Sequence, residues 1–166
     1  FFAEVCAGIK NRLGKCRVLI IGEGEESIKK KMRRIFEKNG VDYEFAGFIQ
    51  HEALPDYYAK SRLLLLPTSA DCWGVVLNEA MNAGTPVITT EWTAAVGELV
   101  LHDQNGYVLP FDVQAWVSAA CRLLSDEAKW DSFSRSAHVT VKEFNYDRAA
   151  EGILDAFAYM LKKNLK

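Results

Sequence analysis

The chain has 166 residues, a length typical of one compact domain that buries a sizeable core. It carries 20 lysines and arginines against 22 aspartates and glutamates, and this formal charge of -2 excludes the broad basic surface of a typical nucleic-acid-binding protein. Hydrophobic residues make up 49% and charged residues 25%, which excludes a disordered or collagen-like chain.

Short apolar runs alternate along the chain with longer segments of helical periodicity. The apolar runs predict strands over 17–21, 43–48, 63–67, 86–90 and 106–110. Helical spacing and end signals predict helices over 25–39, 53–60, 74–83, 94–101, 112–124, 126–142 and 146–163. Because strands that alternate with helices pair in parallel through right-handed crossovers, we expect an α/β fold, a Rossmann-like doubly wound parallel sheet. One domain over 1–166 is expected, with C-terminal helices over about 112–166.

Targeting and redox signals point to the cytoplasm. No apolar run approaches the length of a membrane-spanning helix, and Glu4 interrupts the N-terminal apolar segment, unlike a signal peptide. The four cysteines are widely spaced, so neither a zinc site nor a redox dithiol is signalled. We expect buried free thiols in a reducing compartment.

Three other features have competing interpretations. Gly22 and Gly24 follow a strand as in a dinucleotide-binding turn, but Ser27 replaces the third glycine, so a plain turn is favoured over a nicotinamide site. The basic cluster between Lys29 and Lys38 is interpreted as a solvated helix face, with attraction to anionic lipid head groups as the alternative. The three histidines have no nucleophile beside them in sequence and are expected at the surface.

The segment 67–88 combines an anion site with two acids. A strand ends at Pro67, a polar loop holds Asp71, Gly74 begins a helix, and Glu79 lies inside it. The free N–H groups and the dipole of a helix N-terminus attract anions, and carboxylates accept hydrogen bonds from vicinal hydroxyl groups. This pattern suits a diphosphate between two sugars. The alternative left open is that Asp71 merely caps the helix and Glu79 is an exposed helical residue.

The same residues carry a family resemblance. An acid followed by seven residues and Glu79, then Ala80, Met81 and the Gly84-x-Pro86 sequence, resembles the signature of retaining, nucleotide-sugar-dependent glycosyltransferases of family 4, group 1. RVLIIGEG, FAGFI and GELVLHDQNGYVLPFD extend the resemblance over roughly 5–125. It implies the C-terminal, donor-binding half of a two-domain GT-B type enzyme.

The resemblance also implies roles for single residues. Asp71 matches the catalytic acid near the transferred sugar, although the family usually has Glu there, and Glu79 would bind the donor ribose hydroxyls. The main chain at Ile49 matches the nucleobase contact. The backbone that would meet the sugar and diphosphate comprises Trp73, Gly74, Val75 and Val76. No metal or other cofactor is expected, since protein donors would stabilise the leaving diphosphate.

The implied function is retaining hexosyl transfer from a nucleotide-diphosphate sugar to a carbohydrate or lipid-linked acceptor, in surface polysaccharide or lipopolysaccharide biosynthesis. By the resemblance, the N-terminal acceptor domain and the first strand of this domain are absent, so 1–166 alone would be inactive. The full-length enzyme would be cytoplasmic, with peripheral association at the cytoplasmic membrane face left open. The alternative is a non-catalytic nucleotide-binding or interaction module derived from this fold.

Overall fold

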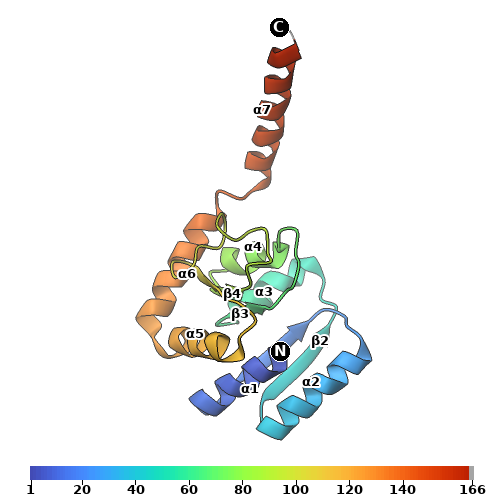
Figure 1. Cartoon of the computed structure of the whole chain (residues 1–166), viewed down its shortest axis with the longest axis vertical. Coiled ribbons are helices and arrows are strands. Elements are labelled where there is room, and N and C mark those ends of the chain that lie inside the picture. Colours follow the sequence, from blue (N-terminus) through green and yellow to red (C-terminus); the bar gives the residue numbers. More distant parts are fainter. Residues whose placement is uncertain (165–166) are drawn as a thin grey trace.

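A computed structural model describes residues 1–164 and shows helices packed around short parallel strands (Figure 1). The elements are α1 (Phe2–Leu13), β1 (Arg17–Ile21), α2 (Glu26–Asn39), β2 (Asp42–Gly47), the 3-10 helix η1 (His51–Ala53), α3 (Leu54–Ala59), β3 (Leu64–Leu66), α4 (Val75–Asn82), β4 (Val87–Thr89), β5 (Gly106–Val108), α5 (Val113–Ser125), α6 (Glu127–Val141) and α7 (Tyr146–Asn164). Every strand expected from the sequence is present. Leu165 and Lys166, at the end of the predicted C-terminal helices, lie outside the described residues.

The strands hydrogen-bond in two groups rather than in one continuous sheet. β1 pairs in parallel with β2, and β4 lies between β3 and β5 with parallel pairing on both sides. Within the described chain β1 and β3 are not hydrogen-bonded to each other, although Val18, Ile20 and Leu65 contribute to the same apolar cluster. The two groups therefore belong to one core, but their facing edges lack a common ladder.

Helices cover both faces of the strands, as the doubly wound prediction requires. On one face, Ile88 and Tyr107 pack with α1 and α5 around the fully buried Trp116. On the other face, Val87 packs with α3, α4 and α6, where Leu77 is also fully buried. The carboxyl ends of the strands are left to the connecting loops, which is where open α/β sheets bind ligands.

Local signals in the sequence set several helix ends. The Asp112 and Asp126 side chains accept hydrogen bonds of 2.9 Å from the N–H groups of Ala115 and Lys129, so both residues are N-caps. Gly40 ends α2 with φ of 61°, a left-handed conformation that favours glycine.

The predicted helix over 94–101 is wrong, because this segment forms turns and isolated bridges. Gly97 adopts φ of 89° and donates its N–H to the Val100 carbonyl oxygen, which breaks the helical path. The buried Asn105 side chain then binds the backbone of Leu99 and Leu101, replacing helical hydrogen bonds.

The last helix, α7, extends away from the rest of the molecule (Figure 1). Its large apolar side chains are exposed, including Ile153, Leu154, Phe157 and Leu161. None of the helices among the described residues has the length and apolar character needed to cross a bilayer.

Candidate functional site

Asp71 lies in a loop that is tied to the loop after β4. Its N–H donates to the Trp92 carbonyl oxygen at 3.0 Å, and its own carbonyl oxygen accepts from Ala94 N at 3.1 Å, forming a bridge with Thr93. The loops that follow β3 and β4 are thus hydrogen-bonded to each other. The hydrogen bonds between these two loops hold Asp71 in the segment just before α4.

The Asp71 carboxylate also shapes the start of α4. Its Oδ1 accepts hydrogen bonds from the backbone N of Trp73 at 3.0 Å and of Gly74 at 2.6 Å. Asp71 therefore orders the turn that leads into α4. The N-cap of the helix is Gly74, which has no side-chain cap hydrogen bond, so the alternative that Asp71 caps the helix is wrong. Oδ2 is not used by these two bonds, so one oxygen of the half-buried carboxylate is left for another partner.

Gly74 makes the tight entry into α4 possible. It adopts φ of 79°, and a Cβ atom there would lie 2.8 Å from Thr93 Cγ2 and 3.0 Å from Leu77 Cδ1. Val75 and Val76 follow as the first helical residues, whose N–H groups have no partner inside a helix. The Val75 side chain is 62% exposed, so this helix end is open to solvent.

Glu79 is held by residues from two other elements. Tyr58 of α3 donates its hydroxyl to Glu79 Oε2 at 2.8 Å, and His51 Nδ1 of η1 lies 3.6 Å from Oε1. The Glu79 side chain is 21% exposed, so the alternative that Glu79 is an exposed helical residue is wrong. Burial, followed by the hydrogen bond to Glu79, raises the pKa of Tyr58 above its ordinary value.

The remaining predicted site residues lie around α4 in different ways. The Trp73 indole donates to Asn78 Oδ1 at 2.7 Å and packs on Phe144 with ring centroids 5.6 Å apart, so its side chain is structural. Ile49 is half-buried. Two residues later in the chain, His51 contacts Glu79 of α4. Gly22, in the turn after β1, donates its N–H to the Gly47 carbonyl oxygen at 2.8 Å.

Sequence reasoning missed the partners that position the two acids. His51 is exposed, as expected for a surface histidine, yet it lies beside Glu79. Tyr58 is 21 residues from Glu79 along the chain, and Thr93 bridges to Asp71 from the next loop. The spacing of apolar residues in 53–60 could have placed Tyr58 on the buried side of that helix, but not against one particular carboxylate.

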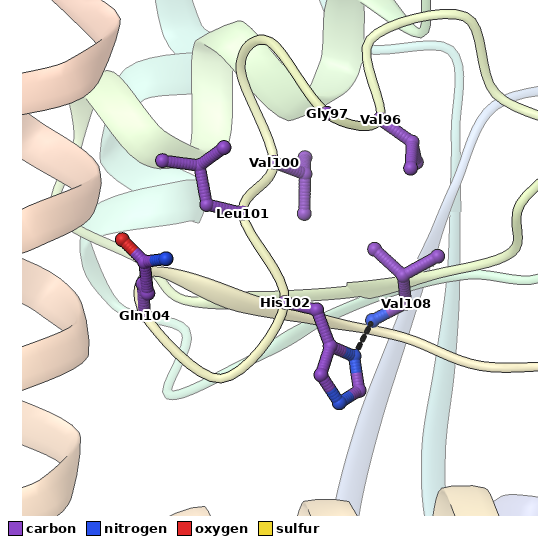
Figure 2. A pocket seen from close by; sticks show the side chains of 7 residues that line it. All are labelled: Val96, Gly97, Val100, Leu101, His102, Gln104 and Val108. Atoms are coloured by element: carbon purple, nitrogen blue, oxygen red, sulfur yellow. Dashed lines mark hydrogen bonds between the residues drawn. The ribbon is translucent and has the colours of Figure 1, made fainter.

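Two surface hollows among the described residues lie apart from Asp71 and Glu79. One, of about 380 Å³, is lined mainly by apolar side chains of the loop after β4, and His102 Nδ1 on its rim already accepts from Val108 N at 3.1 Å (Figure 2). The other, of about 400 Å³, lies at the C-terminal end of α4 beside Arg135 and His138 of α6. Neither contains Asp71 or Glu79.

The cysteines are more varied than expected. All four are free; Cys6 and Cys121 are buried and Cys16 is half-buried, but Cys72 is exposed in the turn after Asp71, so the expectation of buried thiols is wrong there. Burial raises the pKa of the Cys6 thiol. Residues 1–164 contain no group of three or more His, Cys, Asp or Glu side chains arranged to hold a metal ion.

Comparison with known proteins defines the class to which this fold and site belong. Residues 1–126 match the family described as glycosyl transferases group 1, and the chain belongs to this family. Among curated relatives, the D-inositol 3-phosphate glycosyltransferase of Xylanimonas cellulosilytica is 31% identical over 119 residues, covering 69% of this chain and 28% of that enzyme. The chain therefore spans less than a third of that relative's length.

Solved structures confirm the fold class. The C-terminal domain of a glycosyl transferase group 1 family protein, LpcC, from Francisella tularensis superposes with a TM-score of 0.75 at 21% identity, covering 85% of this chain and 75% of that domain. Anabaena Alr3699/HepE in complex with UDP gives a TM-score of 0.71 at 18% identity, covering 95% of this chain and 53% of that protein. The Rossmann-like architecture predicted from the sequence is thus correct.

Proposed function

We propose that this chain is the donor-binding domain of a retaining glycosyltransferase that takes a hexosyl group from a nucleotide-diphosphate sugar. The observation that carries the proposal is the pair of carboxylates around the open N-terminus of α4, with Asp71 before the helix and Glu79 in its second turn. Family membership and the UDP complex of the structurally similar HepE support the same donor class.

Each part of such a donor matches a group in the site. The diphosphate would meet the N–H groups of Val75 and Val76, with the helix dipole adding positive potential. Glu79 would accept hydrogen bonds from the ribose hydroxyls, and the main chain at Ile49 would contact the base. These backbone donors would stabilise the leaving diphosphate in place of a metal ion or other cofactor.

The acceptor belongs to a longer protein. We propose a carbohydrate or lipid-linked acceptor in surface polysaccharide assembly, bound by an N-terminal domain as in a two-domain, GT-B type enzyme. The match covers only 28% of the Xylanimonas cellulosilytica relative, which supports that organisation. Because the acceptor site would lie on the other domain, residues 1–166 alone would not transfer sugar.

A further parallel strand would complete the sheet between β1 and β3. Each of these strands is paired on one side only, and the middle position of the order 3-2-1-4-5-6 falls between them. A strand that precedes α1 would reach this position through a right-handed crossover. Amide hydrogen exchange of residues 18–21 and 64–66 would then be slower in the longer protein than in 1–166, and equal exchange in both would contradict this.

The outer face of α2 favours peripheral association with an anionic membrane. Lys29 and Arg33 are paired with Glu23 and Glu26, but four exposed cations fall on one face of the helix without an ion pair in residues 1–164. This basic stripe of α2 consists of Lys30, Lys31, Arg34 and Lys38. Such a surface would hold the enzyme at the cytoplasmic membrane face, close to a lipid-linked acceptor.

A second candidate function has its own supporting observation. Because Asp71 Oδ1 is engaged by Trp73 N and Gly74 N, the residue has a complete structural role without any catalysis. A non-catalytic nucleotide-binding module would need this ordered turn and Glu79, but no charge on residue 71. Asp71→Asn separates the two functions, since an amide oxygen can accept the same backbone bonds but carries no negative charge.

The experiment has a binding arm and a transfer arm. Thermal stabilisation of residues 1–166 by a panel of nucleotide sugars identifies the donor, because a ligand of the folded state raises its apparent stability. Glu79→Ala should weaken donor binding roughly 10-fold to 100-fold, from the ~1.5–3 kcal/mol of a hydrogen bond to a charged group. Glu52→Ala, at an exposed acid of η1, is the control. Unchanged binding by Glu79→Ala would refute the assignment of the donor site.

In the transfer arm, the full-length enzyme with Asp71→Asn should bind donor normally but lose transfer. Full transfer by this variant would leave Asp71 a structural role only. Transfer by residues 1–166 at the rate of the full-length protein would contradict the proposed division into domains.

A further inference from the structure

Tyr58 is a buried residue whose side chain donates a hydrogen bond to the predicted donor-binding residue Glu79. It lies at the end of α3, is 9% exposed, and packs in the apolar cluster that also contains Leu77 and Met81 of α4. Its backbone carbonyl oxygen accepts the Thr85 hydroxyl at 2.7 Å, so the residue is held from both ends. The phenol therefore has little freedom to move.

The hydroxyl of Tyr58 is a permanent donor to Glu79. Burial and the neighbouring carboxylate raise the pKa of Tyr58, which keeps the hydroxyl protonated at neutral pH. It donates to Oε2, while Oε1 is on the side of His51, whose side chain is 81% exposed. One oxygen of Glu79 is thus fixed from the interior, and the other is presented toward solvent.

This asymmetry has a consequence for binding. A free glutamate side chain on a helix loses rotational freedom when a ligand orders it, and this loss weakens affinity. The exposed His51 contact, at 3.6 Å, is too long and too solvated to fix the carboxylate. Tyr58 is the contact that orders the carboxylate before a ligand arrives.

We propose that Tyr58 is a positioning residue of the donor site, which orients Glu79 so that its carboxylate receives the vicinal 2′ and 3′ hydroxyls of a ribonucleotide. Each oxygen of the carboxylate can accept more than one hydrogen bond, so the bond from Tyr58 does not block a diol. The proposal rests on the function proposed above for Glu79. It goes further in assigning the selection of ribose over a deoxygenated sugar to a residue of α3.

The test compares ribonucleotides with analogues that lack the diol. UDP, ADP and GDP are each titrated by calorimetry beside their 2′,3′-dideoxy forms into the wild-type chain, Tyr58→Phe and Tyr57→Phe. Tyr57 is the matched control, because its ring is half-buried on the same helix and its hydroxyl makes no hydrogen bond to the residues that the structure describes. Thermal unfolding of each variant checks that the fold is kept.

We expect the wild type and Tyr57→Phe to prefer one ribonucleotide over its dideoxy form. Tyr58→Phe should lose about tenfold in affinity for that ribonucleotide and almost nothing for the dideoxy form. In a Glu79→Gln background, the Tyr58 substitution should have no further effect on this preference, because it acts through the carboxylate. A merely structural role would weaken both ligands equally.

Two results would overturn the proposal, and they are distinguishable. If Tyr58→Phe retains the full preference shown by the wild type, Tyr58 does not position Glu79 although the donor site stands. If the wild type itself shows no preference for any ribonucleotide over its dideoxy form, the role proposed for Glu79 fails and the role of Tyr58 fails with it.

Discussion

Replacing Gly74 by alanine tests whether the entry into α4 is as constrained as its geometry indicates. A residue with a Cβ at φ of 79° is strained by about 1–2 kcal/mol. The new Cβ would also press on Thr93 and Leu77, both buried, and such overpacking typically costs about 1–3 kcal/mol. Lower entropy of the unfolded chain offsets about 0.4–1 kcal/mol. The three terms sum to about 1–4.6 kcal/mol, so Gly74→Ala should destabilise the chain by about 3 kcal/mol.

Gly40→Ala is the matched control for this prediction. Gly40 ends α2 at φ of 61°, but nothing lies within 4 Å of the Cβ it would carry. Only the backbone strain applies there, so the expected loss is about 1 kcal/mol. Urea unfolding followed by circular dichroism gives both values from the shift of the midpoint at constant slope. Equal losses for the two variants would refute the reasoning that the α4 entry is sterically closed.

Two further predictions concern pH and membranes. Since the raised pKa of Tyr58 lets the folded chain retain a proton that the unfolded chain releases near pH 10, stability should fall as pH rises beyond that value. Urea midpoints at pH 9 and pH 11 should differ less for Tyr58→Phe than for Tyr57→Phe, and an equal difference would contradict the burial of this phenol. The basic stripe of α2 should give binding to vesicles with anionic lipid but not to neutral ones, at roughly 1 kcal/mol per cation. Serine at all four positions should abolish sedimentation with anionic vesicles, and undiminished sedimentation would exclude the stripe as the contact.

The sequence predicts the elements well where a local signal sets them. Five apolar runs became five strands, and Asp112 and Asp126 cap the helices that follow them. Such signals involve residues only a few positions apart in the sequence, so they can be recognised without knowledge of the tertiary fold. The helix predicted over 94–101 failed because Gly97 turns the chain at a positive φ, and because the side chain of Asn105, outside the segment, binds the backbone of Leu99 and Leu101.

The candidate site is predictable in its main residues but not in its contacts. The acid spacing and the helix start singled out Asp71, Gly74 and Glu79 from the sequence. The orientation of each carboxylate depends on packing between elements: Tyr58 reaches Glu79 from α3, and the loop after β4 bridges to Asp71. The spacing of apolar residues along the sequence cannot predict such contacts, because they join parts of the chain that meet only after folding.

The length of the side chain at residue 71 connects these observations. The aspartate side chain is short enough for its Oδ1 to accept hydrogen bonds from the N–H groups two and three residues later in the chain. This is the geometry of a local turn that aspartate and asparagine favour. A glutamate carries its carboxylate one methylene further from its Cα and does not favour this local turn. Asp71, where the family resemblance implies glutamate, is therefore also the residue that orders this turn. Under the proposed function, the shorter aspartate side chain would extend less far toward the donor sugar but would fix the turn before α4. Its Oδ2 would then be the oxygen that faces the transferred group.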